Sequence, residues 1–112
     1  MKIVINRDYG GFGLSDEAIR EYLRRTYGEG NFQEEEPDKH GFINFLVNGE
    51  YFYDNYIERD DLVLVEVIEE MGEKANGKYA CLKIVEIPAE VDWYIEEYDG
   101  MEHVAEHHRT WC

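Results

Sequence analysis

The sequence predicts a single α+β domain that contains a largely antiparallel sheet and about two helices. Three observations predict this fold class. Short runs of β-branched and aromatic residues recur along the chain, two segments carry apolar side chains at helical spacing, and the dipeptides Asn48-Gly49 and Asp99-Gly100 separate paired runs as hairpin turns do. A chain of 112 residues has room for one hydrophobic core, so we expect residues 1–112 to form one domain.

The N-terminal part of the chain predicts a strand followed by a helix. Residues 2–6 include three consecutive β-branched side chains, which favour a buried strand, and the glycines of residues 10–13 end it. Ser15, followed by two acidic residues, is typical of a helix start, because its hydroxyl caps a free N–H and the acids face the positive end of the helix dipole. Apolar side chains at helical spacing then predict one amphipathic helix that ends at Gly28.

The middle of the chain predicts a loop, a hairpin and a second helix. Residues 28–41 are acidic and almost free of apolar side chains, so we expect an exposed loop. Residues 42–48 and 50–54 flank Asn48-Gly49, which favours a type I′ turn between two strands. Residues 60–71 fit either a strand or a helix; the acidic start, the glycine that follows and a length of about 12 residues favour the helix.

The C-terminal part predicts three more strands. Residues 78–87 form an apolar run that Pro88 ends, and residues 92–98 and 101–105 flank Asp99-Gly100 as a second hairpin. The expected order is therefore strand, helix, two strands, helix and three strands.

Negative charge is concentrated in the second part of the sequence. Residues 1–30 hold five basic and five acidic side chains, whereas residues 31–112 hold six basic and twenty-one acidic ones, so the formal net charge of −15 lies there. Such a surface repels nucleic acid and anionic membranes and attracts basic partners. We therefore expect no direct nucleic-acid binding and no membrane binding, whereas mimicry of nucleic acid fits the charge.

The sequence favours a cytoplasmic protein. It contains no apolar run of the length that spans a membrane and no basic segment followed by an apolar leader. Its two cysteines, Cys81 and Cys112, have no sequence support for a bridge, and we expect both to be free thiols in a reducing compartment.

The loop of residues 10–15 is the candidate binding site. A glycine-rich turn into a helix start presents free N–H groups that can hold a phosphate or a carboxylate. Arginine side chains bind phosphate oxygens in pairs, so arginines from the strand, the helix and the tail would complete an anion pocket. The candidate ligand-binding residues are Arg7, Gly10, Gly11, Phe12, Gly13, Ser15, Arg24, Arg109 and Trp111.

Two structural alternatives to this site stay open. The glycine spacing matches neither the dinucleotide fingerprint nor a P-loop, and three glycines also suffice for a sharp turn from strand to helix. The helix arginines have glutamates three or four residues before them, so they can form ordinary ion pairs on the helix surface.

Catalysis and metal binding have little support in the sequence. Ser15 is the only serine and is expected to cap the helix, and Glu96 and Glu97 point to opposite faces of a strand. His103 and His107 would have metal-ligand spacing on a helix, but part of this segment is expected to be a strand. We therefore expect a protein that is not an enzyme and has no cofactor or metal.

Three segments carry a resemblance to a known family: INRDYGGFGLSDEA, ANGKYACLKIVEIP and DWYIEEYDGMEHVAEHHRTW. With them, the chain resembles a family of short proteins from phages and prophages. The resemblance implies a viral accessory role in an infected bacterial cell, such as inhibition of host defence. It implies no role for any single residue.

Two functional hypotheses follow. In the first, the protein counters host defence by sequestering a nucleotide signal that contains phosphate, in a pocket between subunits of a homo-oligomer. In the alternative, it is an acidic mimic of nucleic acid that inhibits a basic host defence nuclease by protein–protein binding, as some anti-CRISPR proteins do. A virion or assembly accessory role is a third possibility.

Overall fold

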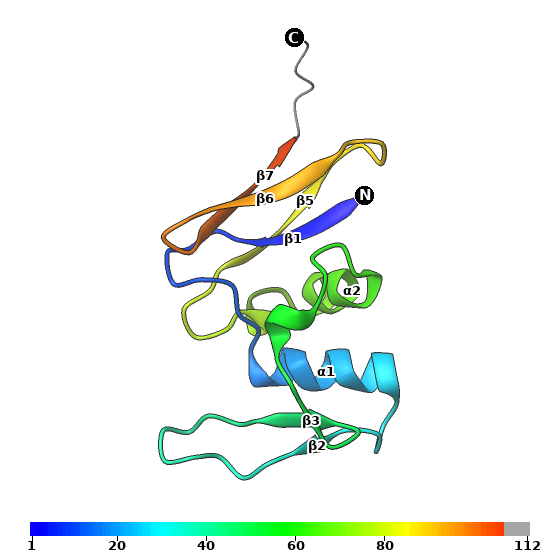
Figure 1. Cartoon of the computed structure of the whole chain (residues 1–112), viewed down its shortest axis with the longest axis vertical. Coiled ribbons are helices and arrows are strands. Elements are labelled where there is room, and N and C mark those ends of the chain that lie inside the picture. The colour runs from blue at the N-terminus through cyan, green and yellow to red at the C-terminus, as the bar shows by residue number, and fades with distance from the viewer. Residues whose placement is uncertain (107–112) are drawn as a thin grey trace.

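The computed structural model describes residues 1–106. Figure 1 shows a stack of layers, in which a hairpin and a strand pair at one end are followed by two helices and then by a small sheet. The elements are β1 (Lys2–Asn6), α1 (Asp16–Tyr27), β2 (Gln33–Glu34), β3 (Phe45–Val47), β4 (Glu50–Phe52), α2 (Leu62–Met71), β5 (Leu82–Glu86), β6 (Trp93–Tyr98) and β7 (Met101–Glu106), with short 3-10 turns at Asp54–Tyr56 and Gly72–Ala75.

The strands of residues 1–106 form three antiparallel sheets. β1 pairs with β5, β2 to β4 form the three-stranded sheet, and β6 pairs with β7. The predicted single α+β domain with two helices and antiparallel strands is therefore confirmed. None of the described helices has both the length and the apolar composition that crossing a bilayer requires.

The core lies where the two helices meet β1 and β3. Val4 of β1, Leu23 of α1 and Leu64 of α2 are fully buried there, and Phe45 of β3 closes the opposite side. Burial of these side chains supplies the main favourable energy of the fold, because apolar area leaves water. Both helices begin as their sequences indicate. Ser15 Oγ accepts from the N–H of Ala18, and the Asp61 carboxylate accepts from two N–H groups in the first turn of α2.

The two hairpin turns and the second helix are confirmed, but the strands of the first hairpin, expected over residues 42–48 and 50–54, are shorter, at Phe45–Val47 and Glu50–Phe52. Asn48 and Gly49 have φ angles of 53° and 80°, and Asp99 and Gly100 have 49° and 90°, so both turns carry the paired positive φ values of type I′ turns. Residues 60–71, which fitted a strand or a helix, contain α2.

Two expectations about the strands need correction. The loop expected over residues 28–41 contains the short, exposed strand β2. The chain reverses direction after β2, so that β3 pairs antiparallel with it. The strand expected over residues 78–87 begins only at Leu82, since residues 77–80 form a turn in which the N–H of Ala80 donates to the carbonyl of Gly77. Cys81, expected inside an apolar strand, is exposed as a result.

The edge of β1 that faces away from β5 is covered by two residues from other elements. The N–H of Val4 donates to the carbonyl of Arg59 at 2.8 Å, and the N–H of Asn6 donates to the carboxylate of Glu102 at 2.8 Å. The Arg59 guanidinium also donates to the carbonyl of Val4. A side chain and a turn thus take the place of a neighbouring strand.

Candidate functional site

The glycine loop between β1 and α1 is occupied by other parts of the same chain. The N–H of Ser15 donates to the carbonyl of Ala75 at 2.9 Å, and the N–H of Leu14 donates to the carboxylate of Asp54 at 2.8 Å. The carbonyl of Gly13 accepts from the N–H of Gly77. Two donors just before α1, which a bound anion would need, are therefore used within the protein.

The glycines permit backbones to approach one another closely. A Cβ atom at Gly10 would lie 2.1 Å from the carbonyl oxygen of Tyr79, and one at Gly77 would lie 2.8 Å from the Gly13 backbone. A Cβ atom at Gly100 would lie 2.3 Å from the carbonyl oxygen of Tyr9. The loop is thus packed between residues 76–79 and the β6–β7 turn, which is the close approach that glycine allows.

The predicted arginines do not gather at this loop in the described part of the chain. Arg7 is exposed after β1. Arg24 lies in the last turn of α1, nine residues from the cap or about 13 Å along the axis, and forms ion pairs with Glu21 and with Glu29 at 3.2 Å. Arg109 and Trp111 were also predicted to line the site, and both lie outside the described residues.

Arg24 and Arg25 form the surface ion pairs that were the structural alternative, whereas Arg20 does not pair with Glu17 as that alternative expected. Glu21 bonds both Arg24 and Arg25, at the expected spacings of three and four residues. Arg20 instead pairs with Glu34 of β2 at 2.8 Å, which holds the edge of the three-stranded sheet against α1. The carboxylates of Glu34 and Asp16 contribute to raising the pKa of Arg20.

Phe12 lies beneath an arginine that the sequence did not single out. The guanidinium carbon of Arg59 is 3.6 Å from the centre of the Phe12 ring, and its two terminal nitrogens bond both carboxylate oxygens of Glu102 at 2.6 and 2.8 Å. Glu102 is only 8% exposed. The stacked, doubly bonded arginine joins the glycine loop, the turn before α2 and β7, and its role is structural.

No sequence signal marks this pair. Arg59 stands in a run of acidic residues, where an ordinary surface ion pair is the natural expectation. Glu102 follows a turn in an acidic hairpin, and only the packing of β7 beside β1 places it inward. Strand alternation would have placed it on the face opposite Met101 and His103, and nothing in the sequence says which face is buried.

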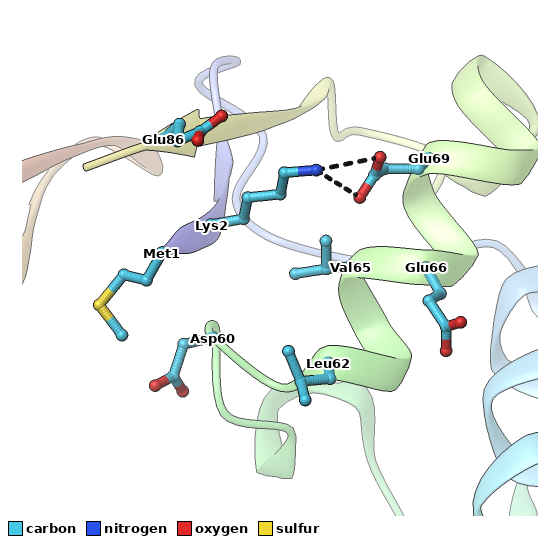
Figure 2. A pocket seen from close by; sticks show the side chains of 8 residues that line it. All are labelled: Met1, Lys2, Asp60, Leu62, Val65, Glu66, Glu69 and Glu86. Carbon is cyan, nitrogen blue, oxygen red and sulfur yellow. Dashed lines mark hydrogen bonds and ion pairs between the residues drawn. The ribbon is translucent and has the colours of Figure 1, made fainter. Parts of the chain in front are cut away.

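A groove between β1 and α2 is a second candidate site, which the sequence did not predict. It has a volume of about 800 Å³. Figure 2 shows Leu62 and Val65 on α2 facing Met1 and Lys2 across it, with the Lys2 ammonium bonded to Glu69. The lining residues are Met1, Lys2, Asp60, Leu62, Val65, Glu66, Glu69 and Glu86. We call this set the β1–α2 groove; its apolar floor and acidic rim suit a partner that is both apolar and basic.

The carboxylates greatly outnumber the cations that could neutralise them. All 26 acidic residues lie in the described range 1–106. Six of them (Glu21, Glu29, Glu34, Glu69, Glu70 and Glu102) form ion pairs with a described lysine or arginine. Twenty carboxylates are thus left without such a partner in this range, and they dominate the potential of the surface.

The described residues contain no arrangement suited to holding a metal ion. Across residues 1–106 no three histidine, cysteine, aspartate or glutamate side chains converge as ligands. His103 instead faces Glu96 across the β6–β7 hairpin, 2.6 Å from its carboxylate. Hydrogen bonds from Tyr94 and from His103 lower the pKa of Glu96, so this carboxyl group holds its negative charge to lower pH than usual.

Comparison of the chain with known protein families, with curated proteins and with solved structures finds no match. The resemblance to short phage proteins therefore stays an expectation that rests on the three quoted segments.

Proposed function

We propose that the protein binds a basic protein through its carboxylate surface, as an acidic inhibitor that occupies a nucleic-acid-binding channel. The observation that carries this proposal is the set of twenty carboxylates without a lysine or arginine partner among residues 1–106. Folding gains nothing from so many like charges, because they repel one another. A partner rich in lysine and arginine would relieve that repulsion on binding.

The carboxylates are distributed over several elements and so present a broad acidic surface. They come from the loop after β2, the turn before α2, α2 itself and the β6–β7 hairpin. A channel that normally neutralises phosphates with lysine and arginine responds to the same sign of charge, and release of its counterions would strengthen binding at low salt. The resemblance to phage proteins makes a host defence nuclease the expected partner class.

Sequestration of a nucleotide has less support from the geometry. The N–H groups of Leu14 and Ser15 are bonded within the chain, and Arg24 is paired at the far end of α1. This first hypothesis stays a prediction with a simple test. Calorimetric titration with a panel of cyclic nucleotides should give no binding heat if the carboxylate surface carries the function, whereas tight binding of one nucleotide would restore the hypothesis.

The test of the acidic inhibitor uses two variants with opposite changes in charge. One replaces three exposed, unpaired acids (Glu36→Gln, Glu58→Gln and Glu97→Gln), and the control replaces three lysines that form no ion pair in the described range (Lys39→Gln, Lys74→Gln and Lys83→Gln). Immobilised protein is used to capture partners from bacterial lysate at low and at high salt, and each captured protein is identified by mass spectrometry and purified.

We expect the purified partner to release bound DNA when the protein is added. The acid-neutralised variant should bind it roughly five- to tenfold more weakly at low salt, as three rim charges of a few tenths of a kcal/mol each would produce. The lysine variant should bind as tightly or more tightly. The proposal would be contradicted if the amount of captured partner changed neither with salt nor with the acid substitutions, or if the partner kept its DNA when the protein is added.

A further inference from the structure

We infer that the β1–α2 groove is a docking site for a basic amphipathic segment of a partner protein, in which one bulky apolar side chain is flanked by lysine or arginine. The inference deepens the proposed function and rests on it for the identity of the partner as a basic protein. It adds the place on the surface and the chemistry of the segment that binds there.

The apolar part of the groove combines exposed side chains at its edge, Leu62 and Met1, with a buried floor, Val65. Leu62 is 82% exposed, although it opens a helix in which Val63 is partly buried and Leu64 and Val65 are buried. Val65 forms the floor of the groove with only 5% of its surface exposed, and Met1 lines the opposite wall. A single exposed leucine is common, but here it stands at the edge of a hollow with an apolar floor.

The charges around the hollow select the partner. Among the residues that the structure describes, four carboxylates line it, from Asp60, Glu66, Glu69 and Glu86, against two ammonium groups, those of Lys2 and of the Met1 N-terminus. The Lys2 ammonium already bonds Glu69 at 3.2 Å, and the terminal ammonium of Met1 donates to the carbonyl of Ile87.

Asp60, Glu66 and Glu86 are therefore left without an ion pair to any residue that the structure describes. Covering them with a neutral apolar surface would strip their water without replacement, and an acidic segment or a nucleic acid would be repelled. Lysine or arginine beside an apolar anchor satisfies both parts of the groove at once. This charge complementarity favours a basic segment over a neutral or an acidic one.

The size of the groove suits a short segment. A volume of about 800 Å³ lies within the range of about 300–1,000 Å³ that is typical of binding pockets, and holds a few large side chains. The groove would thus receive the anchor of a larger interface, with the surrounding carboxylates contributing to attraction and orientation.

The inference is tested by selecting short random peptides, displayed on particles, against the full chain. We expect enriched sequences to carry a leucine, methionine or aromatic residue flanked by lysine or arginine. Synthetic versions should shift the methyl NMR signals of Leu62 and Val65. Leu62→Asp should weaken their binding at least about tenfold, as loss of an interface anchor does.

Tyr98→Asp is the matched control, because Tyr98 is 73% exposed and does not line the groove. This variant should bind the peptides as the original chain does, and circular dichroism should show both variants folded. Three results would each overturn the inference. The enriched peptides are basic but lack an apolar anchor, they bind Leu62→Asp as tightly as the original chain, or they do not shift the methyl NMR signals of Leu62 and Val65.

Failure of the groove and failure of the proposed function give different results. If a basic nucleic-acid-binding partner is captured in a salt-dependent way but binds Leu62→Asp unchanged, the groove inference fails and the acidic inhibitor stands. If the predicted peptides bind at the groove but no partner loses its DNA, the docking site stands and the inhibitor function fails.

Discussion

Replacing Glu102 with alanine removes the acceptor of three hydrogen bonds at once. Its carboxylate accepts one from the N–H of Asn6 and two from the guanidinium of Arg59. The substitution leaves a buried N–H without a partner and an arginine, whose side chain is only 19% exposed, without its counter-charge. Breaking a buried ion pair from one side costs about 3–5 kcal/mol.

We expect Glu102→Ala to lower the free energy of unfolding by about 3 kcal/mol, at the lower end of that range because Arg59 can turn partly toward water. This is a large share of the roughly 5–15 kcal/mol that stabilises a domain. The measurement is urea unfolding followed by circular dichroism and tryptophan fluorescence. Glu69→Ala is the control, since its ion pair with Lys2 is exposed and should cost at most about 0.5 kcal/mol.

A double-mutant cycle isolates the pair. The variant that combines Glu102→Ala with Arg59→Met leaves no buried charge without a partner. Its loss of free energy of unfolding should therefore be about 2 kcal/mol smaller than the sum of the losses of the two single variants. A loss below about 1 kcal/mol for Glu102→Ala, or single effects that simply add, would refute the argument that this pair is a buried, coupled unit.

Three further predictions concern stability and titration. Gly10→Ala should destabilise the fold by about 2 kcal/mol in urea unfolding, because its Cβ would lie 2.1 Å from the Tyr79 carbonyl oxygen, whereas Gly13→Ala, whose Cβ meets nothing closer than 3.8 Å, should change little. Burial, and the hydrogen bond that its hydroxyl donates to Asp61 at 2.9 Å, raise the pKa of Tyr22 to about 12. The stabilisation of the fold that follows from this raised pKa is complete below the unfolded pKa of about 10 and is lost as pH rises through about 12. In an ultraviolet titration of the tyrosines, Tyr22→Phe should remove the ionisation step at the highest pH. Sodium chloride at about 0.15 M should raise the melting temperature above its low-salt value in scanning calorimetry, because it screens the unpaired carboxylates; a constant or falling value would mean that their repulsion is too weak to matter.

Features fixed by neighbouring residues could be predicted from the sequence. The Ser15 cap, the two type I′ turns and both helices depend on residues a few positions apart, and each is where its pattern indicated. The ion pairs of Glu21 with the arginines of α1 also follow from helical spacing. Local geometry is sufficient for all of these.

Features that join distant segments could not be predicted in this way. Arg59 and Glu102 are 43 residues apart, and the β1–α2 groove takes its carboxylates from several elements. Glycines at positions 10–13 indicate a close approach, but the same residues serve equally for a phosphate or for another stretch of the chain. Only the tertiary structure identifies residues 76–79 and the β6–β7 turn as what lies against them.

The covered edge of β1 also bears on how the protein avoids self-association. Ile3, Val4 and Ile5 form an apolar β-branched run, and such a run with free N–H groups is a template on which a second molecule can add a strand. On the edge of β1 away from β5, the N–H of Val4 donates to the carbonyl of Arg59 and the N–H of Asn6 donates to the carboxylate of Glu102. These N–H groups are therefore not free to bond a strand of a second molecule. Loss of Glu102 would free the N–H of Asn6 at the end of this run, so fibre-like aggregates that bind amyloid dyes should accumulate in that variant at concentrations at which the original chain stays dispersed.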